Sequence, residues 1–261
     1  MSIIKIENLC GTQHRFKSAI IKSLLENERD ILLNGQLGNA ICFDGIVDEQ
    51  TYDQQRYRLA FLLKETNGNT SDGTAPDHYD DWDYAGWIRD KQSTGAEPLY
   101  PTFRNIAMWA AVFYDIFEHG STDKENYLHN GVLKVTDSLK STLRRIAVIN
   151  LKKTFGGGTT DWRDLNAYLT QDVCDVIREE IFTAEPTIVL CGGRQVFDFV
   201  GRLHRSEGIA PLTVTTSSGI TVEYIPTADF LYVNFFHPAC RKSREAMFDY
   251  AAEVFAALKN L

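Results

Sequence analysis

Residues 234–248, "NFFHPACRKSREAMF", place a histidine and several cations within a short span. An apolar, strand-like run ends in a His-Pro pair at His237, and the cations Arg241, Lys242 and Arg244 follow directly. A neutral imidazole can donate a hydrogen bond to a leaving group, and cations can hold an anionic substrate. The purely structural alternative is that a strand ends at a proline and a solvated basic turn starts a helix.

The charge balance restricts the partners of the protein. The chain has 261 residues and a formal net charge of -8, so a nucleic-acid backbone would be repelled on average. A DNA partner therefore requires a local basic face. Lysine and arginine do cluster in two places, at 140–153 and 241–244, and these are the candidate DNA contacts.

Other features of the sequence bear on the compartment and on metals. The first residues, "MSIIKIENLC", lack the basic start, apolar middle and cleavage site of a signal peptide, and no apolar run could span a bilayer. Five cysteines without a CxxC pair argue against a disulfide framework and against a Cys-rich metal site. We therefore expect a cytoplasmic monomer with free thiols, no membrane partner, no metal and no cofactor.

The elements that must position these residues follow from hydrophobic patterning. Near-continuous apolar runs of strand length occur at 57–65, 145–150, 187–193 and 232–236. Amphipathic, helix-like stretches occur at 13–29, 103–117, 161–182, 194–204 and 243–261. Buried strands alternating with helices predict an α/β fold: a three-layer sandwich with a central, mainly parallel, four- to five-stranded sheet flanked by helices. We expect one domain over 1–261, with 1–55 as a helical N-terminal extension packed on it.

In such sheets, ligands bind beyond the carboxyl ends of the strands. Those ends read "KETNG", "NLKK", "CGGR" and "HPACRK". Together with their strands they resemble, in order and context, motifs of the uracil-DNA glycosylase superfamily. The matching segments are "LLKETNG" (62–68), "PTFRNIAMW" (101–109), "VINLKK" (148–153), "IVLCGG" (188–193) and "FFHPACRK" (235–242). The resemblance covers about residues 57–258.

This resemblance implies a DNA glycosylase that flips a pyrimidine out of the helix and hydrolyses its N-glycosidic bond without a cofactor. It gives His237 the task of stabilising negative charge on the leaving base, and gives Asn150 the task of reading the Watson-Crick edge of that base. Water positioning falls to Glu65 with Thr66. The structural alternatives are that the histidine and the asparagine merely end strands, and that the glutamate caps a turn.

The first motif departs from the family pattern. Members with the strongest uracil activity have Asp or Asn where Thr66 stands, which leaves Glu65 as the only carboxylate at this strand end. Strict uracil enzymes end the motif with a tyrosine that blocks C5 of the base, and Gly68 would admit a pyrimidine enlarged at C5. The alternative is that this glycine only supplies a positive φ for a turn. Tyr84 or Trp87 would stack on the flipped base, unless they belong to the core.

The second motif departs after the His-Pro pair. Arg241 matches the leucine that enters the DNA helix, where it would fill the gap or hold a phosphate. Lys242, Ser243 and Arg244 would contact phosphates at the start of the last helix, and Lys153 would add a contact from the other basic cluster.

Two other functions remain open. A non-catalytic module of the same fold that binds a nucleotide or nucleic acid would explain two departures. One is the missing carboxylate of the first motif, and the other is Ala239, which stands where the second motif has a serine after His-Pro. A hydrolase of small N-glycosides would suit the net charge of -8 better than a DNA enzyme does.

Overall fold

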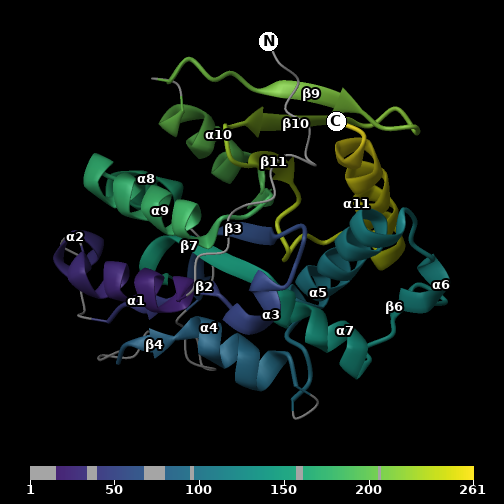
Figure 1. The fold of residues 1–261 in the computed structure, drawn as a ribbon, viewed down its shortest axis with the longest axis horizontal. Helices are drawn as coiled ribbons and strands as arrows, with labels where there is room; N and C mark the ends of the chain where they lie inside the picture. The colour runs from purple at the N-terminus through teal and green to yellow at the C-terminus, as the bar shows by residue number, and fades with distance from the viewer. Residues whose placement is uncertain (1–15, 34–39, 68–79, 95–96, 157–160, 205–206) are drawn as a thin grey trace.

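The computed structural model describes residues 16–33, 40–67, 80–94, 97–156, 161–204 and 207–261 (Figure 1). A seven-stranded sheet with the order β2-β7-β3-β8-β11-β10-β9 forms the centre. Its four middle strands are parallel neighbours: β7 (Ile146–Gly156), β3 (Leu59–Asn67), β8 (Ile188–Gly192) and β11 (Leu231–Phe235). They correspond to the four apolar runs of the sequence, so the α/β class is confirmed.

The sheet is larger and more mixed than predicted. Three further strands pair antiparallel at its edges: β2 (Gly45–Ile46) with β7, β10 (Thr221–Pro226) with β11, and β9 (Leu212–Thr215) with β10. The expectation of four to five mainly parallel strands is therefore wrong in number and holds only for the middle of the sheet. The edge strands lack a continuous apolar run because β2 is short and the side chains of β9 are largely exposed.

Helices cover both faces of this sheet. The main ones are α1 (Lys17–Asn27), α2 (Arg29–Leu33), α5 (Pro101–Tyr114), α8 (Trp162–Tyr168), α9 (Gln171–Ala184), α10 (Arg194–Leu203) and α11 (Arg244–Lys259). The shorter ones are α3 (Glu49–Asp53), α4 (Tyr84–Trp87), α6 (Lys124–Tyr127) and α7 (Asp137–Ser141), with η2 (Ile88–Gln92), η3 (Asp115–His119) and η4 (Thr142–Arg145). None of these described helices is long and apolar enough to cross a membrane.

Most helices match their predictions, but the stretch 161–182 contains two helices. The first, α8, ends before Leu169, whose backbone is non-helical. Thr170 then caps α9, because its hydroxyl accepts a hydrogen bond from the backbone N–H of Val173 at 3.4 Å.

The core consists of two apolar layers, one on each face of the sheet. Along β3, Leu59, Phe61 and Leu63 pack with α5 and α11, whereas Ala60 and Leu62 pack with α1, α9 and α10. Figure 1 shows α5 and α11 on one side of the sheet and α1, α8, α9 and α10 on the other. The strand ends between these two layers are the place where side chains from different strands meet.

The N-terminal segment is integrated into this domain. Its described part holds α1, α2 and α3, as expected for a helical extension, but it also supplies strand β2 to the sheet edge. The two-residue strands β1 (Cys42–Phe43) and β4 (Trp82–Asp83) pair beside it. The fully buried Lys17 ties α1 to the domain, since its ammonium group lies 3.0 Å from a carboxylate oxygen of Asp53 and 3.0 Å from one of Glu185.

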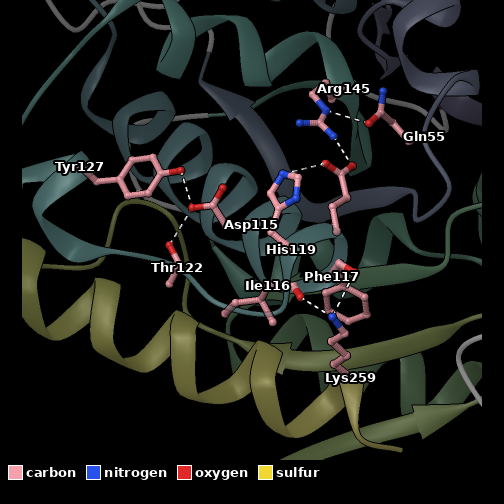
Figure 2. Close-up of polar contacts among 10 residues, drawn as sticks. Gln55, Asp115, Ile116, Phe117, His119, Thr122, Tyr127, Arg145 and Lys259 are labelled. Atoms are coloured by element: carbon pink, nitrogen blue, oxygen red, sulfur yellow. Dashed lines mark hydrogen bonds and ion pairs between the residues drawn. The ribbon is translucent and has the colours of Figure 1, made fainter.

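At the amino ends of the parallel strands, charged groups are closely paired (Figure 2). Arg145 precedes β7, donates from Nε to Gln55 Oε1 at 2.7 Å and forms an ion pair with Glu118. Asp115 accepts hydrogen bonds from two hydroxyl groups, at 2.7 and 2.8 Å. Lys259, at the end of α11, donates to two backbone carbonyls of η3, at 2.6 and 3.2 Å. These contacts hold the end of α5 and η3 against the rest of the domain.

Candidate functional site

His237 lies just beyond β11, against the glycines that end β8. A Cβ atom added to Gly192 would lie 3.6 Å from Cδ2 of His237 and only 2.8 Å from the side chain of Leu63. A Cβ at Gly193, where φ is +104°, would lie 3.8 Å from the Cβ of the histidine. The glycines therefore let the imidazole pack directly against the neighbouring strand ends.

The surroundings of His237 fix its protonation state. Burial and the nearby positive charge of Lys64 lower the pKa of His237 to about 4, so the ring is neutral near pH 7. Its Nδ1 accepts a hydrogen bond from the backbone N–H of Ala239 at 3.1 Å. Because Nδ1 is an acceptor, the proton of the neutral ring resides on Nε2. No residue in the described part of the chain accepts a hydrogen bond from this Nε2–H group.

Lys64 is a cation whose charge acts on this histidine, and the sequence analysis did not mark it as functional. It ends the apolar run of β3, is half-buried, and has its Nζ 5.1 Å from the ring centroid of Trp162. Burial lowers the pKa of Lys64, and among the described residues no carboxylate forms an ion pair with it. Its position at a strand end was the signal available in the sequence.

Glu65 lies at the same strand end and is held by a lysine. Its Oε2 lies 3.6 Å from Nζ of Lys152, the residue opposite it in the register of β3 and β7. Both side chains are largely buried. The β3–β7 register shifts between Glu65 and Thr66, which is the kind of irregularity that redirects side chains at the end of a strand. A carboxylate fixed in this way can orient a water molecule.

Thr66 makes an internal contact in this structure. Its side chain is buried, and its hydroxyl oxygen lies 3.2 Å from the sulfur of Cys42 in β1. That Thr66 helps bind the attacking water stays a prediction.

Asn150 is also used internally. Its side chain is 1% exposed, and its backbone N–H and its side-chain amide both donate to Oδ2 of Asp44, at 2.6 and 2.8 Å. The amide predicted to read a pyrimidine therefore donates to a carboxylate from the N-terminal segment. That Asn150 reads the base stays a prediction.

Lys153 belongs to the same buried cluster, and the prediction that it contacts DNA is wrong. It is fully buried, with its Nζ 2.5 Å from Oδ1 of Asp44 and in an ion pair with Glu180 of α9. Burial favours its neutral form, but the two carboxylates outweigh burial and raise the pKa of Lys153. Burial raises the pKa of Glu180 well above its ordinary value, and Asp44 adds to this effect. The cluster ties β7, α9 and the segment between β1 and β2 together.

The aromatic candidates belong to a cluster on the core. Tyr84 is buried and stacks on Trp87, with ring centroids 5.9 Å apart and planes 11° apart. Trp87 is half-buried and also contacts Tyr100 at 5.5 Å and Phe103 at 5.7 Å. Trp87 and the exposed Tyr100 could each present part of a ring to a ligand. Gly68 lies outside the described residues.

The basic segment after His237 keeps its exposed cations. Arg241 and Lys242 are exposed, and Nζ of Lys242 lies 4.9 Å from the ring centroid of Phe236. Ser243 caps α11, because its Oγ accepts from the backbone N–H of Ala246 at 3.2 Å. Its hydroxyl hydrogen remains able to donate to a ligand.

The comparisons with known proteins found no match: no protein-family model, no curated protein and no solved structure matches this chain. Across the ranges that the structure describes, no three His, Cys, Asp or Glu side chains are grouped as metal ligands.

Proposed function

We propose that this protein is a DNA glycosylase that hydrolyses the N-glycosidic bond of a flipped, damaged or C5-modified pyrimidine. The proposal is carried by one observation: a neutral, partly buried His237 at the carboxyl ends of the central strands, whose Nε2–H has no acceptor among the described residues. The resemblance of the motifs to the uracil-DNA glycosylase superfamily supports it. So does the order of the four parallel strands, each of which brings its motif to the same edge of the sheet.

The chemistry requires stabilisation of a leaving anion. As the bond between C1′ of the sugar and the base nitrogen breaks, both bonding electrons go to the base, and C1′ gains oxocarbenium character. Nε2–H of His237 donates a hydrogen bond to a carbonyl oxygen of the departing base, where the negative charge develops. The positive charge of Lys64 beside the imidazole lowers the energy of the same anion. Water then adds to C1′, and Glu65 orients it and accepts its proton.

Base recognition by Asn150 stays a prediction. The side-chain amide of Asn150 already donates to Asp44, so reading a base would have to accommodate this hydrogen bond. The choice of a C5-enlarged pyrimidine still rests on Gly68 in the sequence. DNA binding is proposed for Arg241 and Lys242, whose charges are exposed and have no ion-pair partner among the described residues.

A second candidate function is a module that binds nucleic acid without cleaving it. The internal contacts of Asn150 and Thr66 favour it, because two side chains that the family pattern uses for catalysis are occupied. A hydrolase of small N-glycosides is a third candidate, favoured by the net charge of -8.

Base release from DNA oligonucleotides separates these functions. The panel contains uracil, thymine mismatches, hypoxanthine and C5-modified cytosines, each incubated with wild type, His237→Ala and the control His129→Ala. His129 is exposed on the hairpin of β5 (Leu128–His129) and β6 (Val132–Leu133). We expect release from one member of the panel, reduced about 100- to 10,000-fold by His237→Ala and unchanged by the control.

The other outcomes decide between the alternatives. No release together with intact DNA binding would support the binding module. No release and no DNA binding would point to a small N-glycoside. Equal release by wild type and His237→Ala would reject the role of this histidine.

A further inference from the structure

The first turns of α5 and α11 meet at the His-Pro loop. The side-chain amide of Asn105, in α5, donates to the backbone carbonyl of Pro238 at 2.5 Å. The loop then passes Cys240, whose sulfur lies 3.4 Å from the sulfur of Met247, and enters α11 at Arg244. Residues at the start of both helices are thereby fixed beside His237.

Two arginines occupy this junction. Arg104 precedes Asn105 in α5, and its Nε donates to the carbonyl of Leu99 at 3.0 Å. Arg244 is half-buried, and burial together with the positive charge of Arg104 lowers its pKa. The positive charge of Arg104 therefore acts against the charged form of Arg244. In the described ranges of the chain, no carboxylate forms an ion pair with either of them.

One donor at this junction is without a hydrogen-bond partner. Nη1 of Arg244 is buried and bonds to none of the described residues. Buried guanidinium donors normally bond to carboxylates or carbonyls, because an unpaired one loses its hydration without compensation. An anion bound here would compensate both the like charges and the unused donor of Arg244.

We propose that Arg104 and Arg244 together bind one phosphate group of a nucleotide, beside the His-Pro loop. The planar guanidinium fork matches the oxygens of a phosphate, and a phosphate would relieve both the repulsion and the unused donor. That the substrate is DNA rests on the proposed function. Arg104 and Arg244 then bind the phosphate next to the target base, whereas Arg241 and Lys242 contact more distant parts of the strand.

The test measures binding of a short fluorescein-labelled DNA oligonucleotide by anisotropy over a range of salt concentrations. The variants are Arg104→Gln, Arg244→Gln and the double variant. The control is Arg202→Gln, an exposed arginine on α10 with one hydrogen bond, to Asn166. Each single substitution should weaken binding about 10-fold and reduce the slope of log affinity against log salt by about one, and the control should change neither.

The double variant tests whether both arginines hold the same phosphate, and the lysine variants test whether the guanidinium fork is needed. Because both arginines hold the same phosphate, the double substitution should cost less than the product of the two single effects. Arg104→Lys and Arg244→Lys keep the charge but lose the fork, so they should retain the salt slope while losing affinity. Circular dichroism of each variant verifies folding, and the lysine variants replace any glutamine variant that does not fold.

Competition by deoxyuridine and by deoxyuridine monophosphate identifies the source of the phosphate. Stronger competition by the monophosphate, lost in Arg244→Gln, would show that a single nucleotide suffices. If the substitutions weaken binding of the oligonucleotide but neither small molecule competes with it, the ligand is a phosphodiester within a strand. Unchanged affinity for all three probes and an unchanged salt slope would overturn the site.

Failure of this site and failure of the proposed function give different results. Arginine-dependent binding without base release would leave the phosphate site standing and reject the glycosylase. Base release with arginine-independent binding would retain the glycosylase and reject the phosphate site.

Discussion

The arginines at the two ends of the parallel strands differ in how well their charges are paired. At the amino ends, Arg145 bonds to Gln55, pairs with Glu118 and lies 3.6 Å from the ring centroid of Tyr114. At the carboxyl ends, Arg244 has a buried donor without a described partner and a like charge beside it. The first arrangement stabilises the fold. The second arrangement destabilises the protein unless an anion is bound. A site that binds anions is expected to have this property.

The interior also contains a cation that is fully paired, since Lys153 is buried between Asp44 and Glu180. We expect Lys153→Met to lower the free energy of unfolding by about 3–5 kcal/mol, because it leaves two carboxylates buried without their cation. Denaturant unfolding measures this, with Lys22→Met on the exposed face of α1 as the control.

The stability of Lys153→Met should depend on pH, and this dependence tests the role of the buried charge cluster. Burial already raises the pKa of Glu180, and loss of the ammonium group raises it further. A carboxyl group whose pKa is raised by folding binds its proton more readily in the folded state, so the variant should regain stability as the pH falls. A loss below 1 kcal/mol that does not change with pH would contradict a structural role for the cluster.

The comparison of the two arginines predicts effects of different size and sign. Arg145→Ala should lower the free energy of unfolding by about 1–3 kcal/mol, because it removes charge-assisted hydrogen bonds. Arg244→Gln should change it by less than about 0.5 kcal/mol, or raise it slightly, because it removes a repelled charge. Parallel urea unfolding of both variants checks this. Equal destabilisation by the two substitutions would contradict the claim that Arg145 stabilises the fold and Arg244 does not.

The smallest expected effect concerns the pKa of His237. Lys64→Met removes the smaller of its two causes, so the pKa should rise above about 4 yet stay below 6.5, because burial remains. An NMR titration of the imidazole resonances measures this, with Lys242→Met as the control. A return to 6.5 would show that charge, and not burial, controls the histidine.

The same shift makes stability depend on pH. The unfolded chain takes up a proton at His237 near pH 6.5, whereas the folded protein does so only near pH 4. Wild type should therefore lose stability as the pH falls through this window, and Lys64→Met should lose less. Above pH 6.5 the histidine is neutral in both states and contributes nothing to this dependence.

The sequence predicted the middle of the fold well and its edges poorly. The four parallel strands are buried on both faces, so their apolar runs were visible in the sequence. In the hairpin of β9 and β10, the side chains of β9 are largely exposed and only two of β10 are buried, so no apolar run marks it; its turn lies at Gly219, where φ is +86°. The break at Leu169 was hidden because a helix cap depends on one local backbone conformation.

The candidate site was predicted in part. A strand end that carries a histidine could be located, because a parallel sheet brings such ends to one edge. The internal contacts of Asn150 and Lys153 could not be anticipated, since their partner Asp44 is 106 and 109 residues away in the sequence. Arg104 was missed because nothing local indicates that α5 and α11 begin side by side.

Asp44 also affects how the chain folds. It lies in the N-terminal segment, yet the groups that it holds are in β7 and α9, which are synthesised much later. Contacts so distant in sequence form slowly, because a long loop must close before they are gained. We therefore expect the charges of Lys153 and Glu180 to be compensated only when this segment docks. A chain without the segment would leave the edge of β7 unpaired, which favours aggregation.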